Sequence, residues 1–114
     1  MQSQPVFVGV DVGASRTKVA ILDENKQLLG HQVRNSGTDF SKTAELCLDA
    51  SLAEANASRR DISSVISTGY GRTNVEFSQG TKTEISCHAV GCYHYFPKAI
   101  TIIDIGGQDN KIIK

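Results

Sequence analysis

The sequence predicts an α/β fold in which a mixed sheet is flanked by helices. Three apolar segments rich in β-branched residues open the chain, and short polar turns separate them, as in an antiparallel meander. Helical and strand-like patterns then alternate, and that order places helices on the faces of a sheet. The chain has 114 residues, of which 39% are hydrophobic, so it can form one domain with its own core.

The first three strands are predicted over residues 6–12, 17–22 and 27–34. Residues 13–15, Gly-Ala-Ser, and residues 23–26, Asp-Glu-Asn-Lys, have the composition of tight turns. Connections this short join neighbouring strands as hairpins, so the three strands are expected to be antiparallel.

A helix is expected after the polar loop at residues 35–39, with Asp39 or Ser41 as its N-cap. Apolar residues recur at helical spacing and form one face. These are Phe40, Ala44, Cys47, Leu48, Leu52 and Ala55. Cys47 is therefore interpreted as a core residue, and the helix is expected to end near residues 56–59.

Shorter patterns predict the rest of the chain. In order, they are a strand at 64–68, a Gly-Tyr-Gly-Arg turn at 69–72, a short helix or irregular turn at 73–79, a break at Gly80, a brief strand at 82–85, a helix at 86–96 closed by Pro97, and an apolar strand at 99–105. The predicted order of elements is therefore βββαβ(α)βαβ.

The turn after the first strand has the composition of a phosphate-binding turn. Asp11 ends a buried strand, and Gly13 permits a positive φ or a close backbone approach. Backbone N–H groups of residues 13–17 can point into one concavity and hold phosphate oxygens. Ser15, Thr17 and Lys18 add possible donors, although strand alternation could turn the lysine away. Asp11 suits a hydrated Mg²⁺, which keeps several waters and uses few carboxylates.

A second turn of this kind lies near the other end of the chain. Asp104 ends a strand, Gly106 and Gly107 form the turn, and Gln108 and Asp109 offer polar side chains. Asp-x-Gly at a strand end is often only a β-turn. Two copies, each between a buried and a returning strand, favour phosphate binding. GxxxxGK[ST] and GxGxxG are both absent, which excludes a P-loop and a dinucleotide-binding Rossmann domain.

The paired hairpins resemble the two phosphate motifs of the acetate-and-sugar-kinase, heat-shock-chaperone and actin superfamily, in which two lobes close on ATP. Four segments narrow the resemblance: DVGASRTK, STGYGR, TEISCHAVG and FPKAITIIDIGGQDNKII. In that order they resemble the ATPase family of 2-hydroxyacyl-CoA dehydratase activators and the ATP-hydrolysing subunits of benzoyl-CoA reductase. The resemblance implies a ribonuclease-H-like, actin-like ATPase lobe.

The resemblance also implies roles for the two turns. Asp11 would position Mg²⁺–nucleotide, and the residues around the phosphates would be Gly13, Ala14, Ser15, Thr17 and Lys18. Asp104 would face Asp11 across the cleft, either holding Mg²⁺ through water or orienting the attacking water. Gly106, Gly107 and Gln108 would form the second phosphate turn. The 69–72 turn would contact nucleotide or partner, or be a surface turn with Arg72 in an ion pair.

The resemblance covers residues 6–114 and divides the chain. Residues 1–98 would form the N-terminal lobe, and residues 99–114 the first hairpin of a second lobe. Family members are more than twice as long, so the chain is interpreted as a truncated form with little ATP turnover alone. The [4Fe-4S] cluster and the homodimer that it bridges are expected only in the full-length family protein, because the cluster cysteines lie in a later segment.

The three cysteines of this chain are interpreted as structural. Cys87 and His88 are adjacent on a predicted helix and point about 100° apart, which is poor geometry for mutual activation. Cys92 lies on the same helix. No CxxC spacing occurs, which disfavours a disulfide framework and favours a reducing cytoplasm.

Composition limits the partners. With 12 basic and 12 acidic residues the formal net charge is zero, which argues against nucleic acid or an anionic membrane as a ligand. No segment approaches the length of a membrane span, and no signal peptide is recognised. The expected partners are nucleotide and a dehydratase or reductase that receives a low-potential electron. The alternatives are a lobe of a small-molecule kinase, such as an N-acetylhexosamine kinase, or a non-catalytic fragment.

Overall fold

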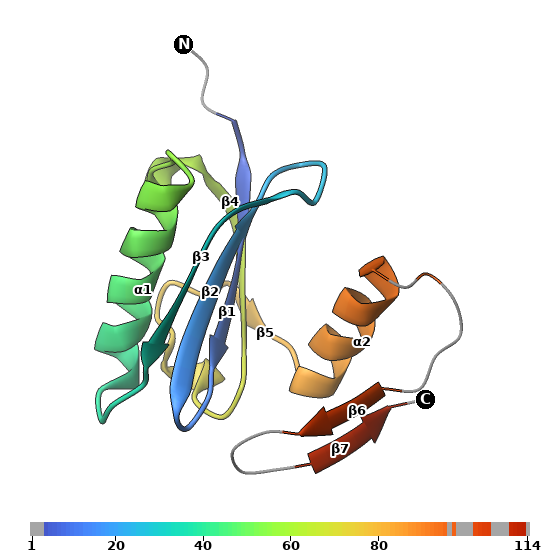
Figure 1. Ribbon diagram of the computed structural model, residues 1–114. Helices are drawn as coiled ribbons and strands as arrows, with labels where there is room; N and C mark the ends of the chain where they lie inside the picture. Colours follow the sequence, from blue (N-terminus) through green and yellow to red (C-terminus); the bar gives the residue numbers. More distant parts are fainter. Residues whose placement is uncertain (1–3, 96, 98–101, 106–109, 114) are drawn as a thin grey trace.

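The computed structural model describes residues 4–95, 97, 102–105 and 110–113. Within these residues, five strands form a mixed sheet in the order β3-β2-β1-β4-β5, and two further strands form a separate hairpin. Helix α1 lies against one face of the five-stranded sheet, and helix α2 lies on the opposite side (Figure 1). The predicted mixed sheet flanked by helices is therefore confirmed.

The meander has the predicted topology. Strands β1 (Val6–Val12), β2 (Arg16–Leu22) and β3 (Leu28–Asn35) pair antiparallel in sequence order. Strand β4 (Ile62–Thr68) pairs with β1 in parallel, and the long connection that a parallel pair needs runs through β2, β3 and α1. The short β5 (Gly80–Thr81) extends the sheet beyond β4, also in parallel.

Alternation along the strands separates the two faces of the sheet. On one face, the side chains of β1, β2 and β4 pack beneath α1 (Phe40–Glu54) and form the core. Its buried apolar members are Val6, Val8, Val10, Val12, Val19, Ile21, Ala44, Cys47, Leu48, Leu52, Val65 and Val75. The helical face predicted from the sequence is therefore the one that packs on the sheet.

Local interactions explain where α1 begins and how closely it packs. Asp39 is the N-cap, and its side chain accepts a hydrogen bond from the backbone N–H of Lys42 at 3.1 Å. Gly30 on β3 lets the helix approach, since a Cβ there would lie 2.6 Å from the carbonyl oxygen of Ser51. Cys47 is fully buried, as predicted, and this burial raises the pKa of its thiol.

The second half of the chain departs from prediction at one point. The brief strand expected at 82–85 is wrong, because the strand is β5 and helix α2 (Glu84–Tyr95) already begins at Glu84. Thr83 explains the early start, since its hydroxyl accepts from the N–H of Ser86 at 3.2 Å. Gly80 also enters the strand instead of only breaking a helix.

The remaining elements are short. Two 3₁₀ turns, η1 (Arg59–Asp61) and η2 (Arg72–Asn74), flank β4. Strands β6 (Ile102–Ile105) and β7 (Asn110–Ile113) pair antiparallel as a hairpin. Residues 99–101 of the predicted strand lie outside the described residues. The division into lobes at residues 98 and 99 stays a prediction.

Candidate functional site

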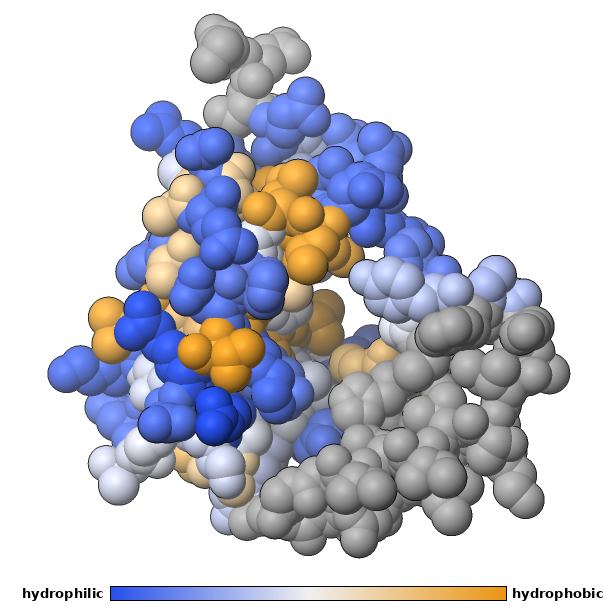
Figure 2. Space-filling view, in the orientation of Figure 1, coloured by the Kyte–Doolittle hydropathy of each residue, from blue (hydrophilic) through white to orange (hydrophobic). Residues whose placement is uncertain are grey.

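A cavity of about 470 Å³ lies on the face of the sheet opposite α1. It is lined by β1, β2, β3 and β4 and by Cys87 of α2, and the surface is hollowed between the sheet and α2 (Figure 2). Asp11, Lys18 and Thr68 are among its lining residues. An aspartate, a lysine and a threonine from the ends of three adjacent strands therefore border the cavity.

Asp11 and Lys18 face each other across the β1–β2 ladder. They are register partners, and the Nζ atom of Lys18 lies 3.4 Å from Oδ2 of Asp11. Strand alternation thus turns the lysine toward the cavity, which the sequence left open. The side chains are 50% and 27% exposed, so the ion pair contributes at most about 1 kcal/mol. Little free energy holds this lysine to the aspartate when an anion enters.

The β1–β2 turn is held in a fixed shape. The N–H of Gly13 donates to the carbonyl oxygen of Arg16 at 2.9 Å, and a Cβ on Gly13 would lie 2.9 Å from the same oxygen. Behind the turn, the hydroxyl of Ser36 donates to the carbonyl oxygen of Gly13 at 2.7 Å. The backbone N–H of Ser36 donates to the carbonyl oxygen of Ser15 at 2.8 Å. Gly13 is therefore needed for a close backbone approach.

One predicted phosphate donor differs from expectation. The side chain of Thr17 is fully buried on the α1 face, where its hydroxyl lies 2.8 Å from that of Ser36. Strand alternation causes this, because Thr17 shares the face of Val19 while Lys18 lies on the other. The Thr17 hydroxyl thus fixes the loop from behind and does not reach the cavity. Ala14 is partly exposed and Ser15 is exposed at the turn itself.

The Gly-Tyr-Gly-Arg turn lies directly against the end of β1. Gly71 donates its N–H to the carbonyl oxygen of Val12 at 2.8 Å. Gly69 has a φ of +93°, and a Cβ there would lie 2.5 Å from both Oδ1 of Asp11 and the carbonyl oxygen of Val12. Both glycines are therefore required by close contacts, and the first one makes room for the Asp11 carboxylate.

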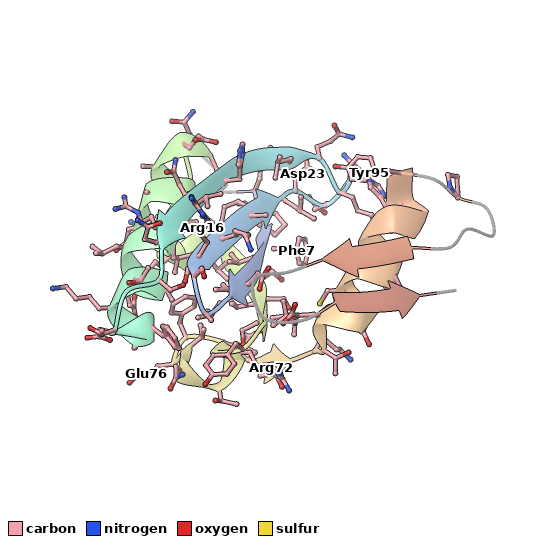
Figure 3. The ribbon with its side chains drawn as sticks, turned by 60° about the horizontal axis from the view of Figure 1, so that its bottom comes forward. Phe7, Arg16, Asp23, Arg72, Glu76 and Tyr95 are labelled. Carbon is pink, nitrogen blue, oxygen red and sulfur yellow. The ribbon has the colours of Figure 1, made fainter. Side chains whose placement is uncertain are left out.

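The two long side chains of this turn, Tyr70 and Arg72, make different contacts. Arg72 donates from Nη1 to the carbonyl oxygen of Gly69 at 3.1 Å, and among the described residues it forms no ion pair. Tyr70 is 65% exposed and meets Phe40 edge to face, with centroids 6.2 Å apart. Figure 3 places Arg72 near the lower edge of the molecule, away from Arg16. Any contact of this turn with nucleotide or partner stays a prediction.

Thr68 and Cys87 were missed as cavity residues. Thr68 is the register partner of Asp11 on the neighbouring strand, and Cys87 extends from α2. The sequence did hold a signal for Thr68, because it ends a strand just before a Gly-x-Gly turn. Cys87 was interpreted as a helix-packing residue, but it is only partly buried and lines the cavity. The side chains of His88 and Cys92 lie outside the described residues.

The second acidic turn is described only in part. Asp104 lies on β6, opposite Lys111 on β7, but its side chain lies outside the described residues, as do Gly106, Gly107 and Gln108. The structure therefore brings together Asp11, Lys18 and the turn at Gly13.

The described side chains suit a hydrated Mg²⁺ better than an iron–sulfur cluster. No three His, Cys, Asp or Glu side chains in the described part of the chain are grouped to share a metal ion. An iron–sulfur cluster requires about four thiolates, so these residues do not fit one. A hydrated Mg²⁺ needs only one or two carboxylates, of which Asp11 can supply one.

In the same part of the chain, neither helix has the length and apolarity of a membrane span.

The chain is similar to known proteins over nearly its whole length. The model of the BadF/BadG/BcrA/BcrD ATPase family matches residues 8–114. The activator of lactoyl-CoA dehydratase from Anaerotignum propionicum is 41% identical over 107 residues, which cover 94% of this chain and 41% of that protein. The chain thus spans about two fifths of the length of the curated relatives it matches.

Two solved structures share the fold. Component A of the (R)-2-hydroxyglutaryl-CoA dehydratase from Acidaminococcus fermentans superposes with a TM-score of 0.88 at 34% identity, covering 96% of this chain and 42% of that one. The activator of the 2-hydroxyisocaproyl-CoA dehydratase from Clostridium difficile, with bound ADPNP, gives 0.86 at 35% identity, covering 96% and 40%. The predicted actin-like, ribonuclease-H-like lobe is therefore confirmed.

Proposed function

Because the chain belongs to the BadF/BadG/BcrA/BcrD ATPase family, we propose that it supplies the first half of an ATP site in an activator of a 2-hydroxyacyl-CoA dehydratase. In this proposal, ATP hydrolysis drives a low-potential electron into the dehydratase, which performs the chemistry on the acyl-CoA. The dehydratase is preferred to a benzoyl-CoA reductase as the partner, because the relatives reported above activate dehydratases.

One observation carries the proposal: Asp11 and Lys18 line one cavity, and their charged groups lie 3.4 Å apart beside a rigid glycine turn. A triphosphate with a hydrated cation needs both charges, one to hold the cation and one to meet the phosphate oxygens. Backbone N–H groups at Ala14 and Ser15 can add donors, while the N–H of Gly13 already donates to Arg16. A purely structural hairpin requires neither charge.

Asp11 would hold Mg²⁺ through water, and Mg²⁺ would neutralise charge on the phosphates. Lys18 would leave the aspartate and bind a phosphate oxygen. The turn residues Gly13, Ala14 and Ser15 would line the phosphates with their backbone. From the second turn, Asp104 would orient the attacking water or hold Mg²⁺ through water, while Gly106, Gly107 and Gln108 would contact the phosphates.

The test uses the complete gene product with a 2-hydroxyacyl-CoA dehydratase from the same organism. Dehydration of the acyl-CoA should require ATP, Mg²⁺ and a reductant. Asp11→Asn should lower that activity by at least about tenfold, a typical loss when a metal site is weakened. Glu24→Gln is the matched control, because Glu24 is exposed in the β2–β3 turn and should leave activity unchanged.

Two results would contradict the proposal. A dehydratase that works equally well without ATP would remove the ATPase from the reaction. Full activity of Asp11→Asn would remove Asp11 from the site, even if the ATP requirement persists.

A further inference from the structure

Thr68 ends β4 with a hydroxyl that is buried but has no hydrogen-bond partner among the described residues. The residue is 8% exposed and lines the same cavity as Asp11 and Lys18. Buried hydroxyls nearly always have a partner, so an exception in a site calls for a partner that the described residues do not supply. Ser67, one residue earlier, shows the ordinary case: its hydroxyl donates to the carbonyl oxygen of Arg72 at 2.8 Å.

The neighbouring acceptor is the carboxylate of Asp11. Thr68 and Asp11 are register partners on adjacent parallel strands, and both side chains lie on the cavity face. Adjacent strands are about 4.8 Å apart, which is within reach of two short side chains. Oδ1 of Asp11 lies so close to Gly69 that a Cβ built on Gly69 would be 2.5 Å from this oxygen. Thr68 and Gly69, at the end of β4, thus lie next to this carboxylate.

In the free protein, Lys18 holds the other carboxylate oxygen. Its Nζ lies 3.4 Å from Oδ2, a long contact between partly exposed groups. A phosphate that entered the site would compete for this ammonium group, and the carboxylate would then lose its charged neighbour. The Thr68 hydroxyl could then donate to this carboxylate, because it has no hydrogen bond to another described residue that would first have to break.

We propose that Thr68 is a positioning residue for Asp11: its hydroxyl donates to the carboxylate when Mg²⁺–nucleotide binds, and this orients the carboxylate toward the hydrated cation. The inference rests on the proposed function. It differs from a structural role, because the hydroxyl has no hydrogen-bond partner among the described residues of the free protein and would act in the bound state. Replacing it by a methyl group of the same shape should therefore leave the free protein intact.

The experiment compares Thr68→Val, Thr68→Ser and wild type in the complete gene product. Calorimetric titration with ADPNP over a series of Mg²⁺ concentrations gives the concentration of Mg²⁺ at half-saturation. Thr68→Val should raise this concentration by about 10- to 100-fold, as expected when a partner that orients a metal site is lost. Thr68→Ser keeps the hydroxyl and should behave like wild type.

Thermal unfolding of the ligand-free proteins is the second readout. Thr68→Val should be at least as stable as wild type. Ser67→Ala is the matched control: its hydroxyl already has a partner, so the variant should lose stability while its Mg²⁺ requirement stays unchanged.

The outcomes separate this role from the proposed function. A wild type without Mg²⁺-dependent ADPNP binding would overturn the proposed function and this role with it. A wild type that binds, beside a Thr68→Val protein with the same Mg²⁺ requirement, would overturn the role alone. A loss that Thr68→Ser does not restore would also overturn it, because shape and not the hydroxyl would then matter.

Discussion

The two faces of the five-stranded sheet are built from the same strands but differ in almost every physical property. On the α1 face, the valines of β1 are at most 4% exposed and belong to the core. On the other face, Phe7 is 37% exposed, and the Asp11 side chain is 27% exposed in a cavity. Phe7 points toward the side of β6 and β7, while α1 lies on the opposite side (Figure 3).

The difference shows how one strand serves as both scaffold and site. Because side chains alternate along a strand, neighbours such as Val10 and Asp11 belong to different faces. Changes on the α1 face should therefore alter stability, and changes on the cavity face should alter ligand binding.

The largest effect is expected for Leu48→Ala. Leu48 is fully buried between α1 and the sheet, so truncation leaves a cavity and should lower the free energy of unfolding by about 2–5 kcal/mol. Leu46→Ala is the control on the same helix, because Leu46 is 48% exposed and should change stability by about 0.5 kcal/mol or less. Urea denaturation measures both. Equal losses would contradict the assigned helix face.

Gly69→Ala should have the next largest effect. The φ of +93° and the contacts with Asp11 and Val12 leave no room for a methyl group, so we expect a loss of about 1–3 kcal/mol in the free energy of unfolding. Gly37→Ala is the matched control, since Gly37 also has a positive φ, of +64°, but open space around it. Chemical denaturation should rank Gly69→Ala as the more destabilising. The reverse order would mean that the 69–72 turn does not pack on β1.

Asp39→Ala tests the helix cap. Loss of the bond to the N–H of Lys42 should cost about 1 kcal/mol of unfolding free energy. Ser41→Ala distinguishes the two caps that the sequence allowed, and it should be nearly neutral because Ser41 already lies inside the helix. If thermal unfolding shows the larger loss for Ser41→Ala, the cap has been assigned to the wrong residue.

The smallest effect is a pH dependence from Cys47. Burial raises the pKa of its thiol above the ordinary value of 9.0, so the folded state keeps a proton that the unfolded state releases. The stabilisation is complete below pH 9.0 and is lost as the pH rises through the folded pKa. The stability difference between wild type and Cys47→Ala should shrink above this pH, by at most about 1.4 kcal/mol per pH unit. A difference that stays constant from neutral to alkaline pH would contradict this.

The sequence predicted the α1 face better than the cavity face. Alternating valines and helical spacing report burial directly, so the meander and α1 were expected with nearly the observed bounds. Thr17 shows that residue type alone can mislead. Its hydroxyl suggested a phosphate donor, but strand alternation places it on the α1 face, where it lies against Ser36.

Thr68 and Cys87 show a second limit. Each becomes a cavity residue only through long-range pairing, Thr68 with β1 and Cys87 by the approach of α2. No local pattern reports which strands become neighbours. The strand expected at 82–85 was wrong for a different reason: a segment of four residues is too short to distinguish a strand from the start of a helix, and here the Thr83 cap starts the helix.

The most direct test of the account is to map bound nucleotide on the two faces. Backbone amide NMR shifts of the complete gene product would be measured during titration with Mg²⁺ and ADPNP. The account predicts saturable shifts centred on residues 11–18 and on Thr68 and Gly69, with little change at the buried positions of α1. Shifts centred on α1, or no shifts in the 11–18 segment at saturating nucleotide, would contradict it.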